Sequence, residues 1–290
     1  MTENKEIIVV TGATGNIGKP VVEQLIEKGY APRVVVRKRE TNADWDADGV
    51  EQHIADLNDV ESLAEAFAGA DRIFSVSPLV ENLVELGKIT VEAAKRAGVK
   101  HIVRSSALGA DVDAPIVLGR WHGAVEKIIE DSGIAFTVVQ PASFFQNYLR
   151  YADTIKTQNA FYAPLGDGKV SLIDARDIAA VAVAALTENE HGGKKYAVTG
   201  GESLSNADIA RIFSEVLGRE IKYVDVPEEA ARKGMFDLKM PAWLVDAIME
   251  LNQIGKAGYV ADVLPTVKDV TGSNPRTFRL FAEENVRLFA

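Results

Sequence analysis

Three glycines near the start of the sequence have the spacing of a phosphate-binding turn. Gly12, Gly15 and Gly18 form the pattern G-x-x-G-x-x-G after the apolar run Ile7–Val10 and at the start of the amphipathic stretch Ile17–Lys28. In such a turn the first glycine permits the sharp bend, the second lets backbone N–H groups approach a pyrophosphate, and the third lets the helix pack close to the sheet. The N-terminus of the helix would offer N–H donors and a partial positive charge to the phosphates.

A glycine-rich turn without any ligand is the alternative interpretation of this pattern. Its position directly after a strand and at the start of a helix favours a dinucleotide-binding loop. We therefore predict cofactor contacts from the loop residues Gly12, Thr14, Gly15, Asn16, Ile17 and Gly18.

The residues after the second predicted strand indicate which dinucleotide is bound. That strand ends at Val36, and no acidic residue occurs before Glu40. An acidic side chain here would accept a hydrogen bond from the ribose 2′-hydroxyl of NAD, whereas a guanidinium suits the 2′-phosphate of NADP. Arg37 and Lys38 therefore predict NADP(H) as the cofactor. A solvated run of charges at a strand end is the alternative.

Other strand ends supply further candidate contacts, because ligands of parallel sheets bind at the carboxyl ends of strands. Asp56 and Leu57 follow the third predicted strand, Val50–Ile54, and would flank the adenine. The end of the fourth strand would lie along the ribose and the nicotinamide, with contacts from Ser75, Val76 and Ser77.

These residues occur in a repeated pattern of short strands and longer helices. Further runs of β-branched and apolar residues predict strands at Arg33–Val36, Asp71–Val76, His101–Ser105 and Phe136–Gln140. Amphipathic stretches predict further helices at Val60–Phe67, Pro78–Ala97 and Leu118–Asp131. Strands that are apolar on both faces suit a parallel sheet with helices on both sides. The predicted fold is α/β, a doubly wound, Rossmann-like parallel sheet with a smaller C-terminal α/β lobe.

The pattern is less regular after Pro141. Helices are predicted at Ala175–Leu186, Asn206–Leu217, Pro241–Leu251 and Thr277–Phe289, and strands at Lys195–Val198 and Ile221–Val226. Ser205 followed by Asp208 is an N-cap signal for the Asn206 helix. We predict an NADP-binding domain at residues 1–150, completed by elements from about 165–200, and a substrate-side lobe at 151–290.

Composition excludes several classes of protein. A formal net charge of −10 argues against a nucleic-acid surface, which needs clustered Lys and Arg in excess. The absence of cysteine excludes disulfides and thiolate catalysis and favours a reducing, cytoplasmic compartment. We expect neither a signal peptide nor a membrane span, since no apolar stretch approaches about 18 residues. No metal site is predicted, because the four histidines are scattered.

The chain also resembles the NmrA-like branch of the atypical short-chain dehydrogenase/reductases. The resemblance covers nearly the whole sequence and is carried by Thr11–Gly18, Val36–Arg37, Ser105–Ser106, His122-x-x-x-Glu126, Ser132–Thr137, Asp174–Ala179 and Val270–Phe278. It implies NADP(H) binding, in a family that includes quinone, triphenylmethane-dye and plant ether reductases as well as cofactor-sensing regulators without turnover.

The resemblance also implies further site residues. Ser105 would contact the cofactor, and the loop Pro141–Asn147 would lie over the nicotinamide, with contacts from Pro141, Ser143 and Phe144. Its aromatic residues, Phe144 and Phe145, could stack a flat substrate. The alternative is that these two rings only cover the interface between the lobes.

One departure from the wider superfamily bears on catalysis. Ordinary short-chain dehydrogenases use Tyr-x-x-x-Lys, in which the lysine lowers the tyrosine pKa, but none of the seven tyrosines here has a lysine four residues on. The two places correspond to His122 and Glu126, one helical turn apart. His122 could donate a proton near neutral pH, with Glu126 fixing its tautomer. Alternatively, His122 lines a crevice and Glu126 pairs with a basic group.

Three functions remain open. The first is an NADPH-dependent reductase of a quinone-like or other conjugated small molecule, and the second is a non-catalytic NADP(H)-sensing regulator. The third, a sugar-nucleotide epimerase-like enzyme, is disfavoured because such enzymes rely on the missing tyrosine–lysine pair. We predict the reductase, with a small-molecule substrate, no nucleic-acid or membrane partner, and a monomeric or homodimeric state.

Overall fold

The computed structural model describes residues 6–40, 45 and 48–290, and its chain divides into two compact units. Unit 1 comprises Met1–Gln140 and Ile178–Ala197, and unit 2 comprises Pro141–Asp177 and Val198–Ala290. The chain therefore leaves unit 1, begins unit 2, returns to unit 1 for 20 residues, and then completes unit 2.

Unit 1 is built on a seven-stranded sheet with the order β3-β2-β1-β4-β5-β6-β9. The strands are β1 (Ile8–Val10), β2 (Arg33–Val36), β3 (Glu51–Ile54), β4 (Arg72–Ser75), β5 (His101–Ser105), β6 (Ala135–Pro141) and β9 (Lys194–Val198). Neighbouring strands from β3 to β6 pair in parallel. Because β2 and β4 flank β1 on opposite sides, the connections diverge at its carboxyl end, which is where ligands bind in open α/β sheets.

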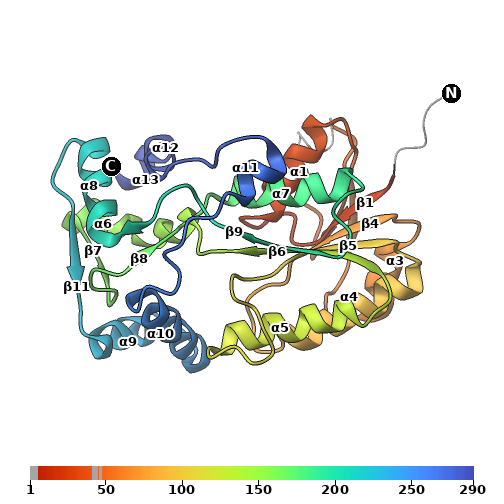
Figure 1. The fold of residues 1–290 in the computed structure, drawn as a ribbon, viewed down its shortest axis with the longest axis horizontal. Helices are drawn as coiled ribbons and strands as arrows, with labels where there is room; N and C mark the ends of the chain where they lie inside the picture. Colours follow the sequence, from red (N-terminus) through yellow and green to blue (C-terminus); the bar gives the residue numbers. More distant parts are fainter. Residues whose placement is uncertain (1–5, 41–44, 46–47) are drawn as a thin grey trace. The chain divides into compact units, whose positions relative to one another are not determined.

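Helices cover both faces of this sheet (Figure 1). One face carries α3 (Val60–Phe67), α4 (Leu83–Ala97) and α5 (Val117–Glu130), and the other carries α1 (Gly18–Glu27) and α7 (Ala175–Thr187). The first face buries one apolar cluster that includes Leu63, Phe67, Ile73, Ile102 and Ile129. Burying a side chain of this size contributes about 1.5–3 kcal/mol to the stability of the fold. Strands that have helices on both sides are therefore apolar on both faces. The predicted doubly wound, Rossmann-like α/β fold is confirmed.

Unit 2 has an aromatic core. The rings of Phe145 and Phe278 meet edge to face with centroids 5.2 Å apart, and Phe213 meets Phe278 at 5.4 Å. Two short strand pairs frame this core: β7 (Ala160–Ala163) with β11 (Lys222–Asp225) in parallel, and β8 (Lys169–Val170) with β10 (Leu204–Ser205) antiparallel. The helices are η1 (Phe145–Tyr151), α6 (Ala152–Gln158), α8 (Asn206–Leu217), α9 (Glu228–Asp237), α10 (Ala242–Lys256), α11 (Thr266–Thr271), α12 (Phe278–Glu284) and α13 (Val286–Phe289).

The structure corrects some predicted elements. Helix α4 begins at Leu83 rather than at Pro78, because the turn in which the N–H of Leu83 bonds to the carbonyl of Val80 comes first. The helix predicted at 277–289 is two helices that meet at Asn285. The N-cap prediction is confirmed, since Ser205 and Asp208 form a complete capping box at α8. Among the described residues, no helix is both long and apolar enough to cross a membrane.

Candidate active site

The turn after β1 has a shape that only glycine permits at two positions. Gly12 has a φ of 62°, and a Cβ there would lie 2.6 Å from Cγ1 of Val76. A Cβ on Gly18 would lie 2.1 Å from the carbonyl oxygen of Gly12. The backbone N–H of Gly15 closes the turn by donating to the same carbonyl at 2.9 Å. The turn therefore brings backbone atoms of Gly12, Gly15 and Gly18 close together and leaves Gly15 exposed to solvent.

A buried threonine fixes this turn to the neighbouring strand. The hydroxyl of Thr11 lies 3.1 Å from the carbonyl oxygen of Val76 and 3.2 Å from that of Phe74, and it accepts the N–H of Val76 at 3.0 Å. Thr11 was not among the predicted contacts. Its position between a buried strand and the first glycine is the signal that could have identified this anchoring role.

The loop and the start of α1 fit a diphosphate. Thr14, Gly15 and Asn16 are exposed, whereas Ile17 and Gly18 are buried. No side chain caps the N-terminus of α1, and its first turn holds no acidic residue. Within the described part of the chain, the positive end of the helix dipole therefore meets no capping side chain and no acidic residue of α1 itself, which suits an anion.

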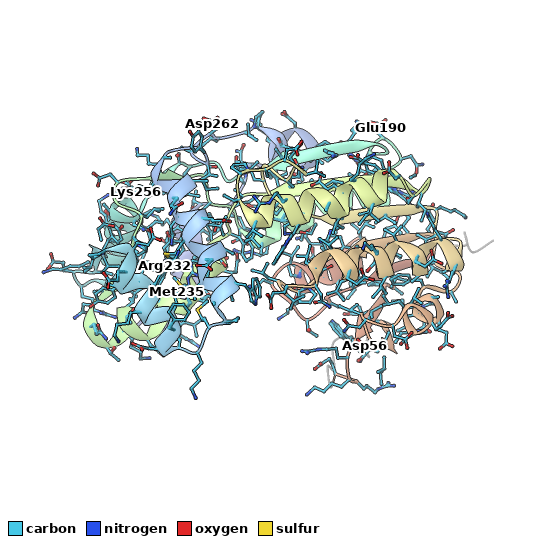
Figure 2. The ribbon with its side chains drawn as sticks, turned by 90° about the horizontal axis from the view of Figure 1, so that it is seen from below. Asp56, Glu190, Arg232, Met235, Lys256 and Asp262 are labelled. Carbon is cyan, nitrogen blue, oxygen red and sulfur yellow. The ribbon has the colours of Figure 1, made fainter. Side chains whose placement is uncertain are left out.

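The predicted adenosine-side residues lie at the ends of β2 and β3. Arg37 and Lys38 follow β2, are exposed, and have no ion pair with any residue the structure describes. Asp56, at the surface of unit 1 (Figure 2), accepts hydrogen bonds from the backbone and side-chain N–H groups of Asn58. The backbone bond from Asn58 does most to hold the pKa of Asp56 below its usual range. Leu57 is half-buried. An exposed guanidinium at this place suits the 2′-phosphate of NADP.

A buried arginine supports the segment after β4. Nη1 of Arg104, in β5, donates to the hydroxyl of Ser77 at 3.1 Å and lies 3.4 Å from the carbonyl oxygen of Ser75. Thr11 holds the intervening Val76. The neighbouring predicted contact, Ser105, ends β5 and is buried. The segment with Ser75 and Ser77 is thus fixed from two strands.

The structure does not pair His122 with Glu126. Both lie on α5, but the buried carboxylate of Glu126 accepts hydrogen bonds from Ser106 and from Gln140, the latter at 2.9 and 3.1 Å. Nδ1 of His122 is buried and has no partner in the part of the chain described. The interpretation that Glu126 fixes the His122 tautomer is therefore wrong, and the alternative, that Glu126 pairs with a basic group, is what the structure shows.

The basic group is Lys195, which sequence reasoning missed. Its Nζ lies 2.8 Å from Oε2 of Glu126 and also pairs with Glu130. Lys195 comes from β9, far along the chain from α5. The lysine of the superfamily's Tyr-x-x-x-Lys motif is therefore absent from α5, where Glu126 takes its place. A different lysine, Lys195, pairs with the Glu126 carboxylate from β9, the last strand of the sheet.

His122 is neutral at physiological pH. Burial, and then the positive charge of Arg104, lower the pKa of His122 to about 3. An imidazolium that donates a proton near pH 7 is therefore not supported. A neutral imidazole can still donate a hydrogen bond through one nitrogen, and this is the role left for His122.

The loop Pro141–Asn147 belongs to unit 2. Ser143 is exposed, and its hydroxyl accepts from Nδ2 of Asn147 at 3.0 Å. Phe144 is half-buried and bridges to Ile173. Phe145 is 2% exposed and packs in the aromatic core, so the expectation that it could stack a flat substrate is wrong.

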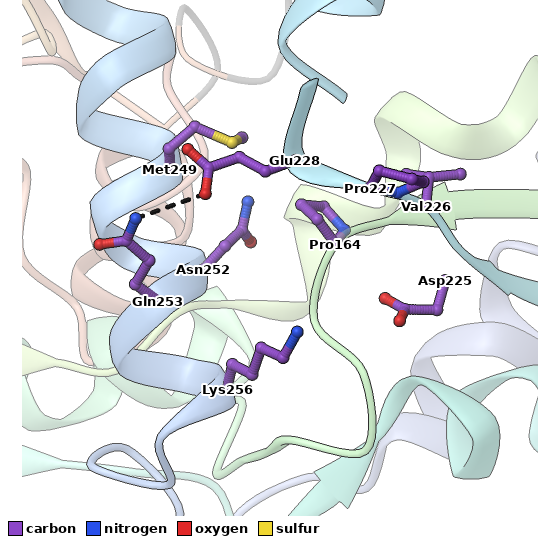
Figure 3. A pocket seen from close by; sticks show the side chains of 9 residues that line it. All are labelled: Pro164, Asp225, Val226, Pro227, Glu228, Met249, Asn252, Gln253 and Lys256. Carbon is purple, nitrogen blue, oxygen red and sulfur yellow. Dashed lines mark hydrogen bonds between the residues drawn. The ribbon is translucent and has the colours of Figure 1, made fainter. Parts of the chain in front are cut away.

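Unit 2 also contains a polar hollow of about 290 Å³ between α9, α10 and β11 (Figure 3). Its carboxylates are already engaged within the unit. Asp225 accepts the N–H of Gly166 at 2.9 Å, and Glu228 accepts from Arg232 at 3.0 Å. None of the predicted site residues lines this hollow.

The chain is similar in sequence and fold to several NAD(P)H-dependent reductases. An NAD(P)H azoreductase from Xenophilus azovorans is 43% identical over 283 residues, which cover 98% of this chain and 99% of that protein. The NADPH-dependent quinone oxidoreductase of Escherichia coli in complex with NADPH has a TM-score of 0.87 and 27% identity, covering 98% of this chain and 100% of that one. The triphenylmethane reductase of a Citrobacter species with NADP(H) has a TM-score of 0.84 and 26% identity, covering 94% and 98%. Residues 4–277 match the NmrA-like family, and the chain therefore belongs to that family.

Proposed function

We propose that this protein is an NADPH-dependent oxidoreductase that transfers a hydride to a small conjugated acceptor of the quinone, azo or triphenylmethane type. The observation that carries the proposal is the turn at Gly12 and Gly18, where no side chain fits, together with the exposed guanidinium of Arg37 after the next strand, which has no ion pair with any described residue. The high identity to an NAD(P)H azoreductase over nearly the whole chain supports the substrate class. A cytoplasmic location, a monomeric or homodimeric state and the absence of a nucleic-acid partner are parts of the same proposal.

In this proposal each group of residues has a separate role. Backbone N–H groups from Gly12 to Gly18 hold the diphosphate, and Arg37, with Lys38, holds the 2′-phosphate. Ser75 and Ser77, fixed by Thr11 and Arg104, lie along the ribose and the nicotinamide. When bound, the dinucleotide supplies the hydride, and the protein supplies proximity and orientation.

The proposed acceptors need little help from an acidic residue. The negative charge that develops on a quinone is delocalised over the conjugated system, and water can protonate the product. A cationic triphenylmethane dye becomes neutral when it accepts a hydride and needs no proton. A neutral His122 and a missing Tyr-x-x-x-Lys motif are therefore compatible with turnover. They would not suit a sugar-nucleotide epimerase, which relies on that motif.

Oxidation of NADPH tests the proposal directly. The purified protein is mixed with NADPH and a panel of quinones, azo dyes and triphenylmethane dyes, and nicotinamide absorbance is followed. We expect oxidation well above the protein-free blank for at least one class of acceptor. NADPH binding without oxidation of any acceptor would instead support the non-catalytic sensor.

Arg37→Ala tests the cofactor preference. We expect wild-type protein to bind NADPH more tightly than NADH, and the variant to bind NADPH roughly tenfold less tightly, because a charge-assisted contact to the 2′-phosphate is lost. Calorimetric titration gives both affinities. Arg39→Ala, an exposed neighbouring arginine, is the matched control and should leave NADPH affinity unchanged. Equal NADPH and NADH affinities in the wild type would reject the preference.

His122→Ala tests the neutral-imidazole role. We expect turnover to fall severalfold while the Kd for NADPH stays constant, whereas His122→Gln should retain more of the rate because its amide also donates a hydrogen bond. Because the pKa of His122 lies at about 3, the wild-type rate should show no step from this residue between about pH 5 and 8. An unchanged rate in His122→Ala would make it only a lining residue.

A further inference from the structure

Arg104 is buried to an unusual degree for a charged side chain. It is 1% exposed and is the largest fully buried side chain in the described chain. It lies on β5 two residues after Ile102, which belongs to the apolar cluster under α3, α4 and α5, so it points to the same face of the sheet. Burial lowers the pKa of Arg104 to about 10, which leaves the guanidinium charged at neutral pH.

The hydrogen-bonding capacity of Arg104 is only partly used. Nη1 donates to Ser77 at 3.1 Å, and its contacts to Ser75 are longer, at 3.4 and 3.5 Å. Nε and Nη2 are buried and have no partner within the described residues. Buried arginines are ordinarily paired with a carboxylate, because an isolated buried charge is costly. An arginine in this state is consistent with a functional rather than a stabilising role.

Among the residues that the structure describes, no carboxylate forms an ion pair with Arg104. The acid that acts on it electrostatically is Glu126, and the carboxylate of Glu126 is paired with Lys195 at 2.8 Å. His122, on the same helix as Glu126, is neutral and therefore does not change the net charge around Arg104. Within the described residues, Arg104 therefore makes its hydrogen bonds through Nη1 alone, and these bonds go to Ser75 and Ser77.

We propose that Arg104 makes the protein discriminate between the redox states of its dinucleotide, so that NADPH binds more tightly than NADP⁺. The inference rests on the proposed function, in which Ser75 and Ser77 lie along the nicotinamide side. The two redox forms carry the same phosphates and differ in the ring, which is positively charged only when oxidised. A buried cation behind these serines repels the oxidised ring and leaves the reduced ring unaffected, and low polarity strengthens the repulsion.

This difference in affinity affects both the release of the oxidised product and the reducing power of the bound cofactor. The oxidised product is released more readily than the reduced cofactor, and, because binding stabilises the reduced form, the bound cofactor is a weaker hydride donor than the free one by the same factor. This selectivity is separate from the 2′-phosphate contact of Arg37, since both redox forms carry that phosphate.

Paired titrations with NADPH and NADP⁺ test the inference. We expect the wild-type Kd for NADP⁺ to exceed that for NADPH about tenfold or more, a difference of roughly 1.4 kcal/mol. Arg104→Met should bring the ratio close to one, and Arg104→Lys, which keeps the charge, should retain most of it. Arg37→Ala is the matched control: it should weaken both forms alike and leave the ratio unchanged.

The outcomes separate this inference from the function it rests on. A wild-type ratio of one or less overturns it, as does an undiminished ratio in a folded Arg104→Met. If Arg104→Met does not fold, the wild-type ratio and Arg104→Lys still decide: loss of the ratio in the lysine variant overturns the charge argument, and its retention supports it. Failure of the wild type to bind either form overturns the proposed function as well.

Discussion

Gly18→Ala is expected to raise the Kd for NADPH about a hundredfold or more, a loss of about 2.7 kcal/mol. The new Cβ would lie 2.1 Å from the carbonyl oxygen of Gly12 and 2.6 Å from its carbonyl carbon. Both are backbone atoms, so the contact can be relieved only by moving the turn or the first turn of α1. Either movement misaligns the N–H groups proposed to hold the diphosphate. Calorimetric titration with NADPH measures the effect.

Alanine substitutions at two other glycines serve as controls for Gly18→Ala. Gly192→Ala, also in unit 1, meets nothing within 4 Å and should leave both folding and NADPH affinity unchanged. Gly15→Ala meets only the Gly12 carbonyl oxygen at 3.3 Å and should have an intermediate effect. Circular dichroism checks that Gly18→Ala is folded. A folded Gly18→Ala with wild-type affinity would contradict the assignment of this turn to the diphosphate.

Glu126→Leu is expected to destabilise unit 1 by about 3 kcal/mol. The carboxylate is 2% exposed and accepts hydrogen bonds from Ser106 and Gln140 in addition to its pair with Lys195. Leucine leaves the donors of Ser106 and Gln140 without their acceptor in a buried site. Lys195, at 40% side-chain exposure, can turn to water or to Glu130, so its loss adds less. Urea unfolding followed by circular dichroism measures the change.

Asp131→Ala, at the C-terminal end of the same helix, is the matched control. It removes the pair of Lys127 with Asp131, whose side chains are 60% and 61% exposed. Exposed pairs one helical turn apart contribute about 0.3–0.5 kcal/mol, so this variant should unfold close to the wild-type midpoint. Equal effects of Asp131→Ala and Glu126→Leu would show that the buried network contributes no more than a surface pair.

Much of unit 1 could be predicted because its elements are encoded locally. The predicted Val60–Phe67 helix matches α3, and the predicted strand His101–Ser105 matches β5. Elements without such a pattern were not predicted. Helix α9 buries none of its residues, and β8 and β10 are two residues long. Neither feature produces a hydrophobic period that a sequence can reveal.

The candidate site likewise contains features that the sequence could predict and others that it could not. The glycine turn could be predicted from spacing because it lies within one strand–turn–helix segment, and Arg37 because it directly follows the next strand. Their contacts with the cofactor stay predictions. The spacing of His122 and Glu126 correctly placed both on one helix, but not the partner of the carboxylate. Lys195 arrives from a strand about 70 positions later, and only the sheet order brings it to Glu126. A burial-dependent property such as the lowered pKa of His122 likewise depends on packing.

Because the chain returns to unit 1 only after beginning unit 2, the sheet of unit 1 cannot be completed early in synthesis. The edge of the sheet beside β6 is completed by β9, Lys194–Val198, so the nascent nucleotide-binding half keeps an open edge until about two-thirds of the polypeptide has been synthesised. A truncation after residue 150 would lack β9 and with it the ammonium group that faces Glu126. Independent expression of the first half alone should therefore yield an aggregation-prone fragment rather than a minimal cofactor-binding module.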